Sequence, residues 1–354
     1  MKRILLAVLL TPLLAVAASA GPLEIFFIDV EGGASTLIVT PTGQTLLIDA
    51  GYGSRAGRDP ATVLAAGGRD PSRILAAAAA AGVDRIDYLL ITHFHNDHVG
   101  GVPELASRIP IGTFIDYGAP LGSDRMARGG FSAYAPVRGD QPHIQPRPGD
   151  QLPLDGLEAT VVSAGGDLLP GALPGAGATN EACAGLEHHA EDGTENFRSL
   201  GVLLRFGEFR FVALGDLSGN TLGRLVCPRN LVGETSVYLV AHHGDYDTNL
   251  PALYAALRPR VAIMNNGVTK GGAPEAFRTL AARPEIEDVW QLHASQNRGA
   301  ANSPDELIAN LDAHDNSTGY WIRLTALEDG SFRIVNGRTG FTKTYSPVSR
   351  DEQP

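Results

Sequence analysis

Short apolar runs alternate with turn-forming residues along the first third of the chain. Three of these runs, rich in β-branched residues and split by Gly or Pro-Thr-Gly turns, predict an antiparallel meander: residues 24–30, 35–40 and 45–51. Residues 72–82 combine strong helix formers with a terminal glycine, which predicts a helix. Two further strands are expected at 85–92 and 112–118.

The second half of the chain resumes the alternation of strands and helices after a loop-rich stretch. This stretch runs from about 119 to 196, is dense in Gly and Pro, and holds one clear strand at 158–164. Later strands are predicted at 199–216 and 319–336 as hairpins, and at 236–244, 260–267 and 288–293. Helices are predicted at 218–226, 250–259, 273–283 and 305–313. The two halves together predict a single α/β domain over residues 21–354, an αββα sandwich of two mixed sheets with helices outside.

The first residues look like a signal peptide. Lys2 and Arg3 precede an apolar stretch from 4 to 17, and the small residues 18–20 form an Ala-x-Ala cleavage pattern. A membrane anchor is the alternative, but the stretch is shorter than the roughly 20 residues that a span needs, and Pro12 interrupts it. We therefore expect cleavage after residue 20 and a periplasmic or secreted protein without a membrane span.

Charge and cysteine content narrow the range of partners. The formal charge is −11, and loss of two basic residues with the signal leaves 26 basic against 39 acidic residues, or −13. Such a surface repels a phosphate backbone, so a small-molecule substrate is expected and a long nucleic acid is not. Cys183 and Cys227 predict a disulfide in an exported chain; thiolate metal ligation is the less favoured alternative.

The stretch "THFHNDHVGG" carries the densest chemistry. His93, His95, Asp97 and His98 follow an apolar strand in the pattern H-x-H-x-D-H. Residues two apart at a strand end project to the same side, so the first two histidines can reach one cation. Asp97 and His98 point elsewhere, towards a second cation. Imidazole and carboxylate ligands suit zinc, whereas a solvated loop would explain neither the strand before it nor the glycines after it.

Two further strand ends carry ligand-type residues. Asp216 follows the strand in "FVALGD" and can bridge two metals, although a helix N-cap is the alternative role. His242 and His243 follow the strand in "YLVAHHG". Strand ends gather along one edge of an open sheet, which predicts a common two-metal centre. We favour His242 as the ligand because it is nearer the strand, and leave His243 to face substrate or donate a proton.

With these pieces in order, the chain resembles the metallo-β-lactamase superfamily over about residues 23–335. "THFHNDHVGG" matches the signature loop, Asp216 the bridging aspartate and "AHHG" the last histidine motif. Asp49 in "LLIDAG" matches an aspartate that supports the metal loop. The nearest branch contains the hydrolase domain of DNA-uptake channel proteins and the phosphorylcholine esterases. Its opening "DVGQGD" is replaced here by "DVEGGA", while its Asn-x-x-Ser is present as "NFRS" at 196–199.

One departure from the superfamily pattern affects the expected substrate. Lactamases and lactonases have another histidine ligand before the bridging aspartate, and the candidates here are His143, His188 and His189. None matches clearly, which favours an open catalytic site. Other candidates for substrate contact follow later strands: Asn265, Asn266, Lys270 and His293. For the last of these, packing at the end of the sheet is an equally good explanation.

The resemblance implies a metallo-hydrolase with two zinc ions, or manganese or iron in their place. Asp97 and Asp216 would hold a water activated by the metals, and His243 or Lys270 would protonate the leaving group. Phosphoesters or phosphodiesters are the favoured substrates, and cyclic esters or amides are the alternative. A metal-binding envelope protein without catalytic activity is a third possibility, because fold alone does not define function.

Overall fold

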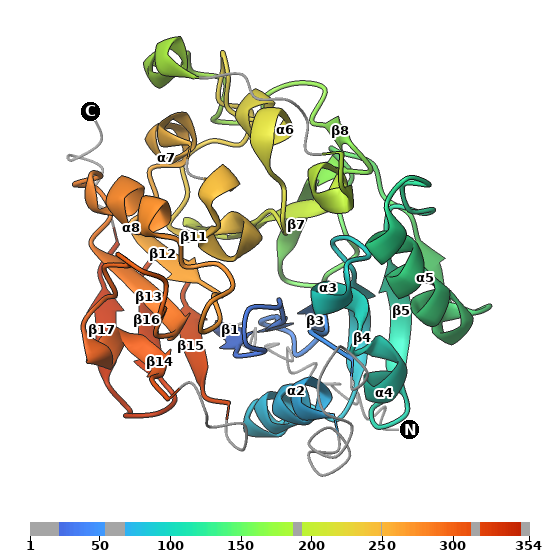
Figure 1. Ribbon diagram of the computed structural model, residues 1–354. Coiled ribbons are helices and arrows are strands. Elements are labelled where there is room, and N and C mark those ends of the chain that lie inside the picture. Colours follow the sequence, from blue (N-terminus) through green and yellow to red (C-terminus); the bar gives the residue numbers. More distant parts are fainter. Residues whose placement is uncertain (1–20, 54–67, 187–192, 249, 313–318, 348–354) are drawn as a thin grey trace, which may run out of the picture.

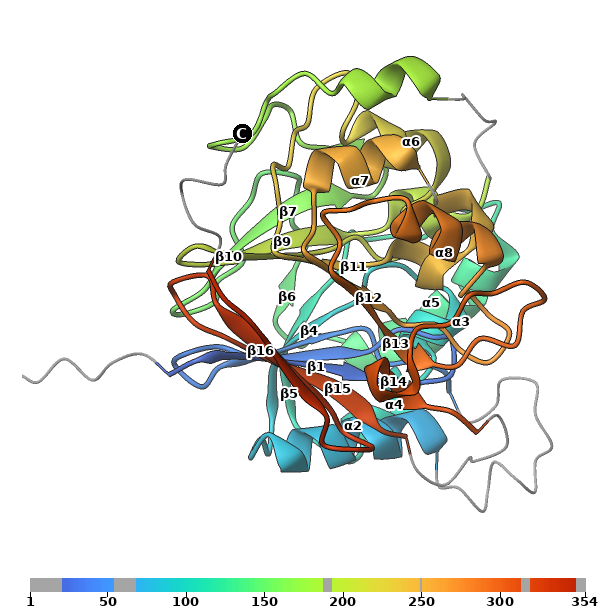
Figure 2. The same ribbon diagram turned by 90° about the vertical axis from the view of Figure 1, so that its left-hand side faces the viewer.

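Two mixed β-sheets pack face to face, and helices cover their outer faces (Figures 1 and 2). The computed structural model describes residues 21–53, 68–186, 193–248, 250–312 and 319–347. Within these residues one sheet has nine strands and the other has eight. Parallel and antiparallel pairs occur in both sheets. The predicted αββα sandwich is therefore confirmed.

Strands from both ends of the chain form the first sheet. Its order is β17-β16-β15-β1-β2-β3-β4-β5-β6. The bounds are β1 Leu23–Ile28, β2 Thr36–Val39, β3 Thr45–Ile48, β4 Ile86–Leu90, β5 Ile111–Ile115, β6 His143–Ile144, β15 Trp321–Ala326, β16 Phe332–Asn336 and β17 Thr342–Tyr345. β1 pairs antiparallel with β15, so that Leu23 lies opposite Ala326. The C-terminal strands thus extend the sheet that the N-terminal meander begins.

The second sheet is made from the later half of the chain. Its order is β14-β13-β12-β11-β10-β9-β7-β8. The bounds are β7 Glu158–Ala164, β8 Asp167–Leu168, β9 Gly201–Phe206, β10 Phe209–Ala213, β11 Val237–Leu239, β12 Val261–Met264, β13 Asp288–His293 and β14 Ile308–Asn310. From β10 to β14 all neighbouring pairs are parallel. The carboxyl ends of these strands therefore share one edge of the sheet.

The helices lie on the two outer sides of the sandwich. Figure 2 shows α6, α7 and α8 on the side of the second sheet, and α2 on the opposite side. The bounds are α2 Arg69–Ala80, α3 Asn96–Val99, α4 Val102–Ala106, α5 Arg125–Arg138, α6 Gly219–Arg224, α7 Pro251–Leu257 and α8 Pro274–Ala281. The part of the chain that the structure describes also contains five short 3-10 helices: η1 Glu181–Gly185, η2 Glu195–Arg198, η3 Ala241–Gly244, η4 Tyr246–Thr248 and η5 Asp305–Leu307.

Alternation along the strands divides the apolar residues between two cores. Phe211 of β10 packs against Phe27 of β1 between the sheets, with ring centroids 5.7 Å apart. Its neighbour Val212 faces the other way, into the core beneath the outer helices that also holds Tyr254 of α7. Side chains two apart in a strand share a face, which explains this division. The second sheet is buried on both faces, and its edge of strand ends is held rigidly.

Two local predictions are wrong. A helix was expected at 305–313, but the chain forms the single turn η5 and then β14, which pairs with β13. Consecutive buried apolar residues follow Pro304, and the Asn310 side chain donates to the carbonyls of Leu292 and Tyr320, so a strand satisfies this segment better.

Helix α5, with 14 residues, lies in the stretch that its Gly and Pro content marked as loop. Gly130 is needed there because a Cβ would lie 2.1 Å from the carbonyl oxygen of Phe94. The glycine that suggested a loop is thus a site of close helix packing.

Three sequence predictions concern export. None of the described helices is long and apolar enough to cross a membrane. A disulfide joins Cys183 of η1 to Cys227 beyond α6, as predicted. The predicted signal peptide lies in residues 1–20, outside the described residues.

Candidate metal centre

The H-x-H-x-D-H loop leads from β4 into α3 and is almost fully buried. His93 and His98 are completely inaccessible to solvent, and His95 and Asp97 are nearly so. The backbone of the loop is pressed against its neighbours, because a Cβ on Gly101 would lie 2.1 Å from the carbonyl oxygen of Ala50. The glycine pair after the motif therefore lets the metal loop pack against the end of β3, as the sequence suggested.

A buried aspartate orients one of the loop histidines. Asp49, which has a left-handed backbone (φ 60°), accepts a hydrogen bond from the Thr92 amide at 2.8 Å. Its other oxygen lies 2.7 Å from Nδ1 of His98. Since a carboxylate only accepts, Nδ1 carries a proton, and in the neutral ring Nε2 is the nitrogen with the lone pair. Asp49 thus supports the metal loop, in agreement with the role implied by the resemblance.

Asp216 stands at the end of β10 and faces four imidazoles. Its Oδ2 lies 3.1 Å from Nε2 of His98 and 3.4 Å from Nε2 of His243. The Nε2 atoms of His93 and His242 are each 3.8 Å away. The Asp216 amide donates to Oγ of a serine in the Asn-x-x-Ser segment, at 3.2 Å. One carboxylate oxygen is therefore surrounded by histidines from two loops that are distant in the sequence.

An unusual backbone aims both tandem histidines at Asp216. His242 and His243 have φ of 48° and 55°, a conformation that side chains other than Gly, Asn and Asp seldom adopt. The His242 amide donates to the carbonyl of Gly215 at 3.0 Å, and the His243 carbonyl accepts from the Gly272 amide at 2.9 Å. Nδ1 of His242 lies 2.8 Å from Oδ1 of Asp247, so its Nε2 faces the centre.

The donor atoms form a group suited to a divalent metal. The side chains of Asp97, His98, Asp216 and His243 offer ligand atoms that all lie within 4.8 Å of one another. Nε2 of His93 is buried without a hydrogen-bond partner among the described residues. Buried imidazole nitrogens are normally paired, so an unpaired one pointing at carboxylates fits metal ligation. Mixed nitrogen and carboxylate donors suit zinc and related ions.

Mutual interactions shift the protonation of this group strongly. Burial opposes the charge on His98, but Asp216 and Asp49 raise the pKa of His98 to about 10. Burial and the His98 charge together hold the pKa of His93 well below its ordinary value. Burial alone would raise the pKa of Asp216, yet the neighbouring histidines keep it well below its usual range. The centre thus holds positive charge between its carboxylates even without an ion.

The residues that the sequence suggested for substrate contact differ in whether they reach the centre. Lys270 contacts the Asp97 carboxylate directly and reaches the centre. Asn266 donates instead to the carbonyl of His293 at 2.8 Å, and His293 is buried with its Nδ1 only 3.3 Å from a backbone carbonyl. Oδ1 of Asn265 is buried without a hydrogen-bond partner among the described residues.

The candidates for an additional histidine ligand are not brought to the centre. His143 lies on the edge strand β6, where its Nε2 is 3.0 Å from Asp116 rather than near the loop histidines. His188 and His189 fall outside the described residues. Sequence reasoning also missed Asp124 and Asp247, which contact ligand-type histidines. Single aspartates in Gly-rich loops carry no signal of their own.

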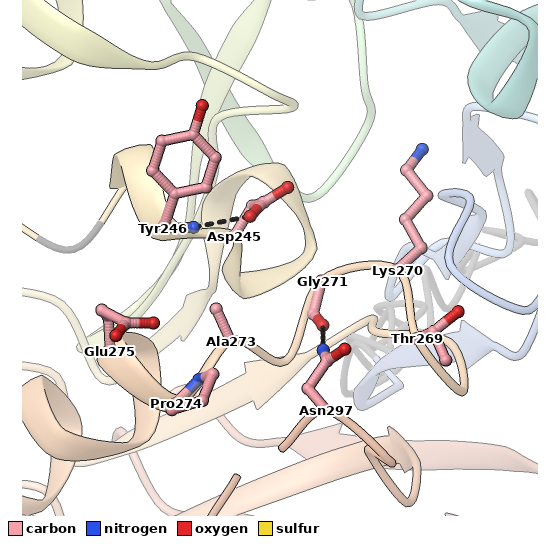
Figure 3. Close-up of a pocket in the computed structure, with 9 residues that line it drawn as sticks. All are labelled: Asp245, Tyr246, Thr269, Lys270, Gly271, Ala273, Pro274, Glu275 and Asn297. Carbon is pink, nitrogen blue, oxygen red and sulfur yellow. Dashed lines mark hydrogen bonds between the residues drawn. The ribbon is translucent and has the colours of Figure 1, made fainter. Parts of the chain in front are cut away.

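An open pocket of about 490 Å³ adjoins the centre. Figure 3 shows Asp245 and Tyr246 on one side and Lys270 on the other. Thr269, Glu275 and Asn297 complete the polar part of its lining, and the Asn297 amide donates to the Gly271 carbonyl at 2.7 Å. Lys270 lines the pocket and also contacts Asp97, so this lysine connects the pocket to the ligand group.

A family model matches the first part of the chain. Residues 28–178 match the family model described as "Metallo-beta-lactamase superfamily". This span includes Asp49 and the H-x-H-x-D-H loop, and it ends before Asp216 and the tandem histidines. No curated protein sequence matches the chain.

The solved structures that match the chain share little sequence with it. The metallo-β-lactamase fold protein YhfI from Bacillus subtilis is 12% identical, with a TM-score of 0.44 over 77% of this chain and 96% of that one. The diiron β-hydroxylase CmlA from Streptomyces venezuelae is 14% identical, with a TM-score of 0.41 over 77% of this chain, which spans 48% of CmlA. A diphosphatase of the PhnP family is 11% identical, with a TM-score of 0.35 over 69% of this chain and 87% of that one.

Proposed function

We propose that the chain is an exported metal-dependent hydrolase of the metallo-β-lactamase superfamily that acts on phosphoesters or phosphodiesters. The observation that carries the proposal is the position of Asp216, whose Oδ2 lies between 3.1 and 3.8 Å from Nε2 of four histidines. The disulfide and the signal-like N-terminus support export. The family match over the signature loop supports the superfamily assignment.

The geometry favours a role as metal ligand for both tandem histidines rather than for His242 alone. His243 groups with Asp97 and His98, since its Nε2 lies 3.4 Å from Oδ2 of Asp97. His242 is the histidine that remains to complete a second set with His93 and His95. It would then take the place of the intermediate histidine for which the sequence offers no clear match. Asp216 would be shared between the two sets.

Two divalent ions bound there would supply Lewis-acid activation of a water and of the substrate oxygen at neutral pH. The chain itself provides the remaining functions. Asp97 and Asp216 orient the water, and the buried loop keeps other water away from it. Burial lowers the pKa of Lys270 to about 7, so this lysine can pair with an anionic substrate oxygen or donate a proton to the leaving group.

The pocket supports an anionic substrate of modest size. Lys270 places one cationic group where the pocket meets the ligand group, and a phosphoester oxygen can pair with it. The opposite wall carries Asp245 and the exposed ring of Tyr246, which would repel a long polyanion but accept a neutral or cationic substituent. A small phosphodiester with an uncharged or basic leaving group fits both walls.

Metal analysis and turnover test this function directly. The purified protein should contain about two zinc, manganese or iron ions and should hydrolyse bis-p-nitrophenyl phosphate or p-nitrophenyl phosphorylcholine faster than nitrocefin or a homoserine lactone. The double variant His95→Ala/Asp97→Ala, which removes one ligand from each set, should lose metal and turnover together. His242→Ala and His243→Ala should each retain about one ion.

A histidine outside the centre provides the matched control. His143→Ala removes an imidazole that also contacts a buried aspartate, and it should change neither metal content nor rate. Full activity after chelation and removal of metal would contradict the proposal. Faster hydrolysis of nitrocefin or the lactone would agree with the proposed metal centre but would contradict the proposed substrate class.

A further inference from the structure

The side chain of Asp124 accepts four hydrogen bonds and donates none. Oδ1 accepts from the amides of Met126 and Ala127 at 2.9 and 3.1 Å, which caps helix α5. Oδ2 accepts from the Glu195 amide at 2.9 Å and lies 2.8 Å from Nε2 of His95. Both carboxylate oxygens are therefore occupied as hydrogen-bond acceptors.

The surroundings of Asp124 determine which nitrogen of His95 carries the proton. Three of the four contacts are backbone amides, which can only donate, and the carboxylate can only accept. The short contact between Oδ2 and Nε2 then requires a proton on Nε2. The second nitrogen, Nδ1, is left with a free lone pair in the neutral ring. The arrangement is the reverse of that at His98, where Asp49 holds Nδ1 and frees Nε2.

We propose that Asp124 is a positioning residue that holds His95 in the tautomer with Nδ1 free to bind metal. The inference rests on the proposed metal centre and adds a residue that the loop motif does not contain. An outer carboxylate of this kind fixes both the tautomer and the ring orientation of a ligating histidine. Asp124 also connects this histidine to two other elements, α5 and η2, through its remaining hydrogen bonds.

The aspartate is itself held in place from the second half of the chain. Glu195 is fully buried, and its carboxylate accepts from the Leu121 amide at 2.7 Å and from the Tyr117 hydroxyl. These contacts fix the backbone whose amide donates to Asp124. The side chain of Asp124 cannot turn away from His95 without losing the helix cap and the Glu195 bond together. His95 is thus oriented by a buried bridge between two distant segments.

Asp124→Asn separates this role from helix capping, because asparagine caps a helix as well as aspartate does. With Oδ1 kept on the helix amides, Nδ2 takes the place of Oδ2 and presents a donor to Nε2–H of His95 and to the Glu195 amide, so the bond from that amide is lost as well. The ring must then move its proton to Nδ1. Nitrogen-15 NMR of histidine-labelled, metal-free protein should show Nε2–H in the wild type and Nδ1–H in the variant. Zinc affinity in a chelator competition should fall about 10- to 100-fold.

Asp116→Asn is the matched control. Asp116 is also fully buried, lies 3.0 Å from Nε2 of His143 and accepts from Tyr134 of α5 at 2.7 Å, but it contacts no residue of the centre. The Asp116→Asn variant should be less stable than the wild type but should keep its zinc affinity and its His95 tautomer. If Asp124→Asn does not fold, Asp124→Ser preserves the cap without reaching His95, and about a tenfold affinity loss is expected.

The outcomes separate this inference from the proposed function. An unchanged tautomer in Asp124→Asn, or a loss of affinity no larger than that of Asp116→Asn, would overturn the role of Asp124. So would wild-type zinc affinity in Asp124→Ser. A wild-type protein that binds no metal would instead reject the metal centre, while the NMR comparison in metal-free protein would still decide the tautomer.

Discussion

The two halves of the chain hold the same kind of ligand by different means. In the first half, His95 and His98 stand behind buried carboxylates, Asp124 and Asp49, whose other acceptor sites are occupied by backbone amides or a threonine hydroxyl. In the second half the histidines are aimed by backbone conformation, with positive φ at both positions, and His242 also has a partly exposed carboxylate, Asp247, behind it.

Exposure differs in the same direction. The side chains of His242 and Asp247 are 16% and 22% exposed, whereas those of His98 and Asp49 are at most 1% exposed. The His98–Asp49 pair is therefore more enclosed than the His242–Asp247 pair, which has more freedom to adjust to an ion, whereas His243 is as buried as the loop histidines. Asp216 belongs to the second half by sequence, yet its contacts extend to both.

Asp216→Asn should have the largest effect, because it removes the charge on which both halves converge. The shape is preserved, but no shared anion then faces the four imidazoles. We expect loss of bound metal and at least about a 10³-fold decrease in kcat/KM, since several kcal/mol of transition-state stabilisation depend on the ions. Metal content and turnover measure this. Retention of both ions would show that the two halves bind metal independently of Asp216.

The sequence predicts the parts of this comparison that lie at strand ends. The H-x-H-x-D-H loop follows β4 of the first sheet, and Asp216 and the tandem histidines follow the parallel strands β10 and β11 of the second sheet. All three follow apolar strands, but the packing of the two sheets, rather than one shared sheet edge, brings the loop to the other two. Asp49 is recognisable because it too follows an apolar strand. These residues are adjacent to the regular elements that position them, so local pattern is enough to find them.

The supporting residues of the loops are a different case. Asp124 precedes a helix that contains Gly129, Gly130 and Pro136, all of which suggest a loop. Its partner His95 lies 29 residues away, and the Glu195 amide 71 residues away. Only the packing of α5 against the metal loop brings them together. Tertiary contacts of this kind override local propensity, as they do for β14, where a helix was expected.

The pH dependence of stability should distinguish the metal-free from the metal-bound protein. Burial opposes the charge on both His98 and His242. Against this effect, Asp216 and Asp49 raise the pKa of His98 to about 10, and Asp216 and Asp247 raise the pKa of His242 to about 9. Raised histidine pKa values stabilise the fold fully below about pH 6.5 and lose that contribution as pH rises through about 9 to 10.

Chelated protein should therefore lose a few kcal/mol (~3) of unfolding free energy between about pH 6.5 and 10. Metal binding requires neutral imidazoles, so zinc affinity should increase over the same range. Urea unfolding with and without zinc measures both trends. Asp216 raises the pKa of both His98 and His242, which come from different halves. Asp216→Asn should therefore make the unfolding free energy of the metal-free protein depend less on pH. A metal-free protein whose stability rises with pH would contradict the charge arrangement.

The smallest effect should come from the two carboxylates that face His98 and His242. Asp49→Asn keeps a residue that tolerates positive φ, but either orientation of its amide places a donor against Thr92 or His98. Zinc affinity should fall about 10- to 100-fold. Asp247→Asn can still accept from Nδ1 of His242 through its amide oxygen, in a more exposed position, so a change of no more than about threefold is expected.

Asp247→Ala is the control for that second change, since it removes the acceptor entirely. It should weaken zinc binding more than Asp247→Asn and less than Asp49→Asn, because His242 keeps its backbone bond to Gly215. Equal losses for the two asparagine variants would mean that the tandem histidines depend on their carboxylate as strongly as the loop histidines do. The two halves would then be organised alike, and the positive φ values would be a consequence of the chain path rather than the means of aiming His242.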